Sequence, residues 1–542
     1  MYKRSANQIG IWILSLILIS PIIVPIAQIF IPEGQIFEHL WQTVLPTYTL
    51  NTLIMIIGVC LLSAFFAIPS AWFMARCDIP GKKHLQWLLL LPLAMPSYVV
   101  AYIYTDLFDY AGPIQTALRN IFGWSSPNDY WFFDIRSLYG GILILSLALY
   151  PYLYLLTRAS FLEQSQNMVD VSRIHGCTPW SSFRRISLPL ARPAIVVGLS
   201  LIAMETVADF ATMNYFAINT LTTAVYDVWL GYGSLNAAAK IAAMVLLIIF
   251  VLLGIERISR RRQQQIQRSM GLDNLQKHKL KGWEKIGALS LCWFLVIFGF
   301  GLPFFILLEY AWNYWGNSWN QQFLLSTWHS LMIASIAALL TLLVAVIFGF
   351  VNRVYPGRLS RIPARISTMG YAMPGTILAV GVLIPLTVID HCFNNVSEYF
   401  WNDHVGLILS GTIFAVIFAY VVRFSSISIG TIESSLSKLP ENYDGASRTL
   451  GCPPLKMFIT VHLPLIRKGC LVATLLVFIE AMKELPAVLL LRPFNFETLA
   501  TTVFQYVSDE MLQYAALPAI ILVLAGLIPL LIINRSLERS HS

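Results

Sequence analysis

Long apolar stretches separated by short polar segments run along the whole chain. Those long enough to cross ~30 Å of membrane hydrocarbon lie near 9–30, 50–75, 85–108, 138–158, 193–218, 237–256, 286–309, 327–351, 364–389, 404–424, 468–491 and 514–534. The first lacks a small-residue cleavage site before its polar end, so we expect it to remain as a span. The pattern predicts an all-α polytopic membrane protein with 12 transmembrane helices.

Composition supports the same class. Hydrophobic residues make up 57% of the chain and charged residues only 12%, and the mean hydropathy is +0.68. These values lie outside the range of soluble domains. The 7 cysteines are scattered without the spacing of a disulfide framework or a metal site, so we expect no stably bound metal.

The basic residues predict the orientation in the membrane. Short loops rich in Lys and Arg stay on the cytoplasmic side, and with both termini inside, nearly all of the 36 Lys and Arg residues fall there. The expected outer loops hold only Arg119, Arg136 and Arg492, and the spans, apart from their cytoplasmic ends, hold only Lys240 and Lys483. The net charge of +8 then marks a surface beside anionic lipid, and no nucleic-acid partner is expected.

One unusual polar segment occurs twice between apolar stretches. Residues 170–176 read DVSRIHG and are followed by ISLP at 186–189, while residues 445–451 read GASRTLG and are followed by VHLP at 461–464. We call these the first and second duplicated loops. Their spacing predicts two short amphipathic helices in each loop, joined at a Gly that takes the left-handed conformation, with the Leu-Pro pair ending the second helix.

The repeat extends over the whole chain at an offset of 275 to 278 residues; for example, Ala94-Met95-Pro96 matches Ala372-Met373-Pro374. Both Met-Pro pairs predict helix kinks. We expect a first six-span repeat at 1–256, a basic cytoplasmic linker at 257–285 and a second repeat at 286–542. An even number of spans returns the chain to its starting side, so the two six-helix repeats are parallel and related by an axis along the membrane normal.

The duplicated loops resemble the "EAA" loop of permease subunits in bacterial binding-protein-dependent ABC importers. The resemblance implies a type I ABC importer permease (MetI-like) fold and an inner-membrane location. It also implies that the loops dock on a cytoplasmic homodimeric ABC ATPase. The ATPase-coupling residues would be Asp170, Ser172, Gly176, Ile186, Leu188, Pro189, Ala446, Ser447, Gly451, Val461, Leu463 and Pro464. The second loop departs from the pattern, because Gly445 stands where the leading acid is expected.

Two further segments resemble fused, double-length permeases of ferric-iron importers. They are ETVADFATMNYF at 205–216 and MKELPA at 482–487. The resemblance implies iron(III) as the cargo and a periplasmic or lipid-anchored iron-binding protein as a partner. The sequence contains no Gly-x-x-x-x-Gly-Lys-Ser/Thr phosphate loop. We therefore expect no enzyme activity and no cofactor in this chain, with ATP bound by the partner subunit.

Acidic residues within the predicted spans are the candidate translocation path. Glu205 and Asp209 are four apart, as are their repeat counterparts Glu480 and Glu484, and Lys483 lies beside them. Residues i and i+4 share one helix face, so four carboxylates could face a common axis. A charge in hydrocarbon costs at least ~2.5–3.5 kcal/mol on insertion scales. The acids could contact a cation such as Fe³⁺, which prefers oxygen ligands. Alternatively, they could pair with Lys483 or make polar contacts at helix breaks.

Two alternatives remain from the sequence. The same architecture could carry thiamine, a polyamine or a phosphonate. A secondary transporter with parallel six-span repeats, driven by an ion gradient, would need no ATPase.

Overall fold

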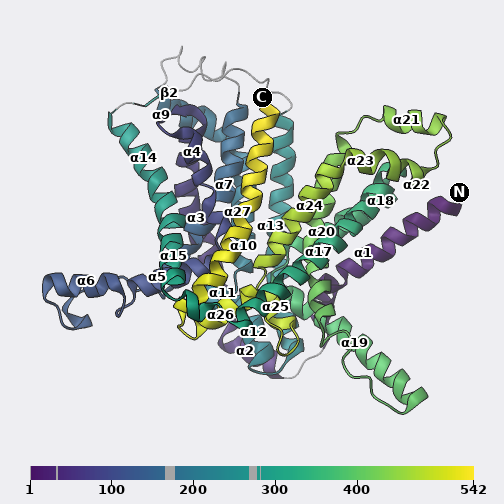
Figure 1. Ribbon diagram of the computed structural model, residues 1–542, viewed down its shortest axis with the longest axis horizontal. Helices are drawn as coiled ribbons and strands as arrows, with labels where there is room; N and C mark the ends of the chain where they lie inside the picture. Colours follow the sequence, from purple (N-terminus) through teal and green to yellow (C-terminus); the bar gives the residue numbers. More distant parts are fainter. Residues whose placement is uncertain (1, 32–34, 165–177, 268–277, 281, 542) are drawn as a thin grey trace.

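The computed structural model describes residues 2–31, 35–164, 178–267, 278–280 and 282–541. Its elements are helices (Figure 1), apart from one parallel pair of two-residue strands, β1 (Cys77–Asp78) and β2 (His278–Lys279). Within the described ranges, 9 helices are long and apolar enough to cross a membrane, or 10 if one bent pair counts as a span. The all-α polytopic fold is confirmed.

The first half runs from the N-terminus to the basic segment in the middle of the chain. Its helices are α1 (Tyr2–Gln28), α2 (Gln35–Thr43), α3 (Leu45–Arg76), α4 (Lys82–Leu88), η1 (Leu91–Ala94), α5 (Ser97–Phe108), α6 (Pro113–Phe122), η2 (Pro127–Asp129), α7 (Leu138–Glu163), α9 (Pro179–Ser182), η3 (Phe183–Ser187), α10 (Leu188–Ala208), α11 (Ala211–Tyr215), α12 (Leu221–Leu230) and α13 (Leu235–Gln267). Helix α13 continues into the predicted linker, whose boundaries stay a prediction.

The second half repeats this order with small differences. Its helices are α14 (Gly282–Val296), η4 (Ile297–Gly301), α15 (Leu302–Asn313), α16 (Trp315–Ser318), α17 (Gln321–Val354), α18 (Arg358–Ser367), η5 (Thr368–Ala372), α19 (Gly375–Trp401), α20 (Ile413–Ser437), α21 (Asn442–Thr449), α22 (Pro454–Met457), η6 (Phe458–His462), α23 (Leu463–Leu465), α24 (Arg467–Lys483), α25 (Pro486–Leu491), α26 (Leu499–Ser508) and α27 (Leu512–His541). Each predicted span contains a helix, but α24 has only 17 residues.

Two predicted spans begin earlier in the sequence than the helices that correspond to them. The stretches at 364–389 and 404–424 correspond to α19 and α20, which begin at Gly375 and Ile413. The apolar residues before Ile413 form a loop, because the buried carboxylate of Asp390 accepts hydrogen bonds from the backbone N–H groups of Leu409 and Ser410. Hydropathy alone does not reveal these hydrogen bonds.

The two Met-Pro pairs mark complete helix breaks, which is a stronger effect than the predicted kinks. Met95 and Met373 both have extended backbone after a short 3₁₀ turn, and a new helix begins just past each proline. In the first half, the helical segments before and after the break differ in direction by 92°. Proline has no N–H to continue the ladder of the preceding helix, which explains the position of each break.

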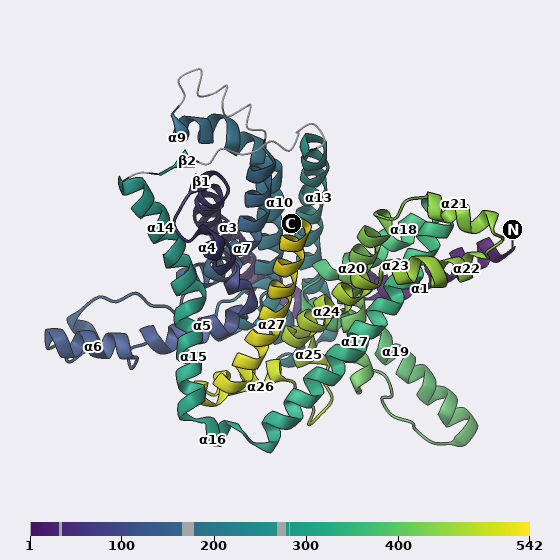
Figure 2. The same cartoon turned by 45° about the horizontal axis from the view of Figure 1, so that its top comes forward.

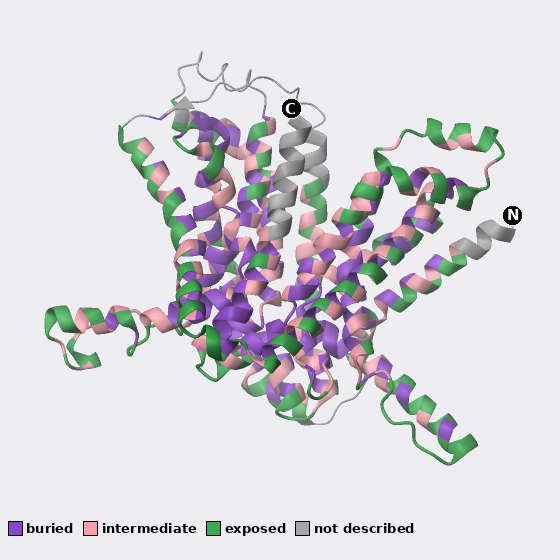
Figure 3. Cartoon of the chain, in the orientation of Figure 1, coloured by how far each residue is buried: buried purple, intermediate pink, exposed green. Residues whose placement is uncertain are grey.

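The first helix of each half packs against the opposite half. Helix α1 contacts α18 and α19, and α14 contacts α3 and α4. The two duplicated-loop regions, α9 and α21, lie at the same end of the molecule as the C-terminus, while α2, α12 and α26 lie at the opposite end (Figure 1). Buried residues concentrate in the bundle where the halves meet (Figure 3). The candidate site lies in this region.

Candidate functional site

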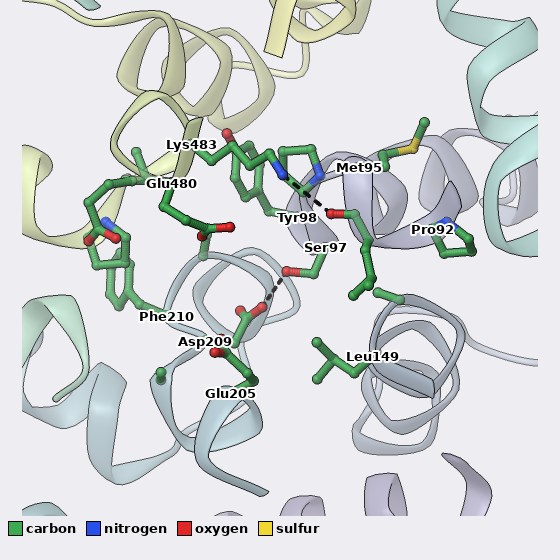
Figure 4. A pocket seen from close by; sticks show the side chains of 18 of the residues that line it. Pro92, Met95, Ser97, Tyr98, Leu149, Glu205, Asp209, Phe210, Glu480 and Lys483 are labelled. Carbon is green, nitrogen blue, oxygen red and sulfur yellow. Dashed lines mark hydrogen bonds between the residues drawn. The ribbon is translucent and has the colours of Figure 1, made fainter. Parts of the chain in front are cut away.

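A cavity of about 180 Å³ lies between the two halves. Its walls come from the break before α5, from α7, from the end of α10 and from α20, α24 and α25. All four predicted acids and Lys483 line it (Figure 4). The structure therefore brings together, from segments about 275 residues apart, every residue that the sequence suggested for the translocation path; their role there stays a prediction.

Two of the acids cap helix breaks. The Asp209 carboxylate lies just after α10 and accepts hydrogen bonds from the Thr212 backbone N–H (2.8 Å), the Thr212 hydroxyl (3.1 Å) and the Ser97 hydroxyl. Glu484 lies just after α24 and accepts from the Ala487 backbone N–H at 3.2 Å. The expectation of continuous i,i+4 helix faces is therefore wrong, because each helix ends before its second acid.

The other two acids, Glu205 and Glu480, lie in the last turns of α10 and α24. Among the described residues, no hydrogen bond or ion pair engages either carboxylate, and both border the cavity. The repeat thus separates the four acids into two kinds. One pair stabilises the chain where the helices stop, and one pair, with one member from each half, faces open space.

Two cations accompany the acids, and both come from the second half. The Lys483 ammonium donates to the Leu93 carbonyl at 3.4 Å. The Arg423 guanidinium lies 3.3 Å from a Glu484 oxygen. At the same repeat offset the first half has Ala208 and Ala148 in these places, and both alanines also line the cavity. The cavity is therefore symmetric in its acids and asymmetric in its bases.

Arg423 was missed by the sequence reasoning, which placed it at the cytoplasmic end of the span expected at 404–424. Helix α20 runs from Ile413 to Ser437, so Arg423 lies inside it. The apolar sequence on both sides of Arg423 was an available signal. A charge within a span costs free energy, and charged residues found there are usually functional.

The cavity also contains a hydroxyl without a partner. Tyr98 is 5% exposed and lines the cavity, and its hydroxyl has no hydrogen-bond partner in the described part of the chain. Carboxylate and hydroxyl oxygens are the donors that hard cations prefer. Across the described ranges, however, no three His, Cys, Asp or Glu side chains are placed so that they could hold a metal ion together.

The second duplicated loop has the helix–Gly–helix form that its sequence predicts. Helix α21 ends before Gly451, which has a φ of 72°, and Pro454 begins α22. The backbone N–H groups of Gly451 and Cys452 donate to the carbonyls of Arg448 and Ser447, both at 3.0 Å, and thereby cap α21. Helix α21 contains no buried residue, Ala446 is exposed, and Leu450 is 86% exposed.

An acid does hold this loop, one position earlier than the pattern suggests. The Asp444 carboxylate lies 2.8 Å from Nε of Arg353 and 2.7 Å from Nε2 of the buried His462. Burial by itself would raise the pKa of this carboxyl, but the hydrogen bonds from Arg353 and His462 hold the pKa below its usual value. We call Arg353, Asp444 and His462 the loop anchor. It fixes α21 to the end of α17 and to the segment that re-enters the bundle.

The first duplicated loop is only partly described. Asp170, Ser172 and Gly176 lie outside the described residues. The Arg76 guanidinium at the end of α3 donates to the Gln164 carbonyl at 2.9 Å, just before this loop. Arg76 and Arg353 occupy corresponding positions in the two halves.

The Leu-Pro pairs do not end the second helix of each loop as expected. Ile186 lies in the π turn η3 and Val461 in the π turn η6. Leu188-Pro189 and Leu463-Pro464 follow these turns at the start of the next α-helical segments. A wider turn accommodates the proline, which lacks an N–H, so the chain re-enters the bundle without a full stop.

Comparison with known proteins adds independent evidence. A family model described as "Binding-protein-dependent transport system inner membrane component" matches residues 67–265 and again residues 341–541. The two matches lie one in each half of the chain. Together they cover well over half of it.

Individual relatives differ in how much of this chain they match. The Fe(3+)-transport system permease protein FbpB 2 of Haemophilus influenzae is 25% identical over 493 residues, covering 90% of this chain and 89% of that protein. The ferric transport system permease protein FbpB of Actinobacillus pleuropneumoniae is 23% identical over 487 residues, covering 86% of this chain and 67% of that protein. The molybdenum transport system permease protein ModB of Escherichia coli K12 is 28% identical over 232 residues, covering 41% of this chain and 96% of that protein. A single-length relative thus matches less than half of this chain.

Proposed function

Because the chain belongs to the family of binding-protein-dependent transport system inner membrane components, we propose that it is the double-length permease of an ATP-driven importer for iron(III). The cavity between the halves is the observation that carries the choice of cargo. Its walls hold four carboxylates against two basic side chains. Two of those carboxylates, Glu205 and Glu480, are free to meet a cation.

The proposed transport step uses these free acids as transient ligands. Fe³⁺ is a hard ion that favours oxygen donors, and two carboxylates with the Tyr98 hydroxyl offer such donors without enclosing the ion completely. A weak and incomplete site lets the cargo leave, which conduction requires. Glu205 and Glu480 belong to different halves, so movement of one half against the other would change the distance between them.

The energy would come from a separate homodimeric ATPase. The exposed α21 with Leu450 is suited to a groove on such a partner, and two equivalent loops on one chain suit a partner with two equivalent subunits. We place both loops and both termini on the cytoplasmic side. A periplasmic or lipid-anchored iron-binding protein would deliver the cargo at the opposite end of the molecule.

An oxyanion is the second candidate cargo. Relatives of single length include a molybdenum transport permease, and Arg423 and Lys483 could meet an anion in the same cavity. Arg423 is already paired with Glu484 at 3.3 Å, however. Among the described residues that line the cavity, Lys483, which donates to the Leu93 carbonyl, is then the one base outside an ion pair, against the two acids Glu205 and Glu480, which favours a cation.

Uptake by proteoliposomes that contain the chain, its ATPase and its binding protein would test the proposal. We expect ATP-dependent uptake of iron(III) but not of molybdate. The paired changes Glu205→Gln and Glu480→Gln should reduce iron uptake at least tenfold. Glu309→Gln is the matched control, because Glu309 is an exposed acid away from the cavity.

Two results would contradict the proposal. Molybdate uptake that exceeds iron uptake would assign the cavity to an anion. Iron uptake that is unchanged in the double variant, at equal protein content, would remove the carboxylates from the path.

A further inference from the structure

A hairpin at residues 109–137, which contains α6 and which we call the lateral arm, projects sideways from the bundle. In two views it leaves the molecule at the level of α15, on the side opposite α19 (Figures 1 and 2). Helix α15 is part of a candidate membrane span, Gly282–Asn313. The lateral arm therefore extends outward beside a candidate membrane-spanning segment, away from the body of the bundle.

The lateral arm contains a small hydrogen-bonded cluster of polar side chains. Arg119, Tyr130 and Gln115 form a chain of hydrogen bonds within it. Gln115 is 8% exposed and accepts a hydrogen bond from the Tyr130 hydroxyl. The Arg119 guanidinium donates to the Tyr110 carbonyl at 2.7 Å and to the Thr116 hydroxyl at 3.0 Å.

Three large apolar side chains of the same arm are exposed. Ile121 is 73% exposed, Phe122 is 60% exposed and Trp131 is 87% exposed. Figure 3 shows α6 in the colours of exposed and intermediate residues, with little of it buried. Large apolar side chains exposed on one projection are unfavourable in water and are stabilised by contact with an apolar medium.

The second half has a related projection at the end of α19. There the Asn394 side chain is tied to the Gly406 backbone by two hydrogen bonds of 2.9 and 3.0 Å. Tyr399, Phe400 and Trp401 are exposed. The two projections leave the molecule on opposite sides (Figure 1). Opposite outward directions suit a surrounding medium better than a single partner seated over the central axis.

We propose that the lateral arm lies in the interface of the lipid bilayer, with Ile121, Phe122 and Trp131 inserted at the boundary between headgroups and acyl chains. Aromatic side chains are enriched at that depth, and a helix with one apolar face binds there in the membrane plane. In this position the arm anchors the first half to the lipid. It also widens the area over which the protein contacts the membrane surface.

A photocrosslinking experiment tests the proposal without cargo or ATPase. The photoreactive residue p-benzoylphenylalanine replaces Phe122 or Trp131, which are exposed, so the fold should tolerate the change; gel filtration in detergent checks this. The variants are placed in vesicles of phosphatidylethanolamine and phosphatidylglycerol and irradiated. Asn128 is the matched control, because it is an exposed polar residue in the same arm.

We expect lipid adducts at positions 122 and 131, several-fold above those at 128, when the peptides are analysed by mass spectrometry. The pattern should persist when a candidate binding protein is added. Adducts to the binding protein in place of lipid would make the arm a docking surface and overturn the proposal. Absence of lipid adducts at 122 and 131, or equal labelling at all three positions, would also overturn it. The outcome is independent of the transported cargo.

Discussion

At the scale of single residues, Arg423 and Glu484 form an ion pair within the bundle, with the charged atoms 3.3 Å apart. The Arg423→Met variant would leave the Glu484 carboxylate without its cation, and loss of one partner of a buried pair costs about 3–5 kcal/mol. We expect a large fall in thermal stability in detergent. Adding Glu484→Gln should recover part of that loss, because the uncompensated charge is then gone.

The double-mutant comparison distinguishes pairing from packing. If the stability losses of the two single variants simply add in the double variant, the two charges do not interact. Glu484 has a second task, since it caps the break before α25 through the Ala487 N–H, so the recovery should be incomplete.

Asp209 offers a cleaner separation of charge from hydrogen bonding. Asn keeps a side-chain oxygen for the Thr212 N–H, whereas Ala removes it. Loss of such a cap costs about 1 kcal/mol. We therefore expect Asp209→Asn to melt near the wild-type temperature and Asp209→Ala to melt lower. Equal destabilisation by both variants would show that the negative charge, rather than the cap, is what the site needs.

At the scale of elements, the loop anchor connects the second duplicated loop to α17. The pKa of Asp444 is lowered in the folded protein by its bonds to Arg353 and His462, against the effect of burial. A lowered pKa gives stabilisation that is complete above the unfolded value of about 3.9. The stabilisation is lost as the pH falls through the folded value.

The Asp444→Asn variant should therefore be less stable than the wild type at pH 7, and the difference should shrink below a pH of about 4. Protease cleavage within α21, followed against pH, would measure it. Glu441→Gln is the control, because Glu441 is an exposed acid next to the same helix. A difference between the Asp444→Asn variant and wild type that grows on acidification would contradict the assigned direction.

Sequence patterns identified the elements well but not where helices stop. The duplicated motif predicted the left-handed Gly451 and the helices on either side of it, because glycine and proline impose local backbone geometry. The acids were found because charge is rare in spans. Their division into capping and free pairs could not be predicted, since it depends on breaks at Asp209 and Glu484 that apolar periodicity does not mark. Arg423 was missed when the loop before α20 was counted as a span.

At the scale of the whole molecule, the exchange of first helices joins the two halves. Helix α1 packs on α18 and α19 of the second half, and α14 packs on α3 and α4 of the first. The short β1–β2 pairing adds a backbone link between Cys77–Asp78 and His278–Lys279. An apolar stretch indicates a span but not its neighbours, so this exchange was not predictable from the sequence. It implies that neither half can bury its surfaces alone.

A chain divided between residues 267 and 278 tests this dependence. We expect fragments 1–267 and 278–542 to purify together when produced in one cell, since the exchanged helices hold them without the connecting peptide. Each fragment produced alone should aggregate or be degraded. Removing residues 1–44 from the first fragment should weaken its capture of the second, because α1 then no longer covers α18 and α19. Stable, monodisperse single halves that fail to bind each other would show that the exchanged helices contribute little to assembly.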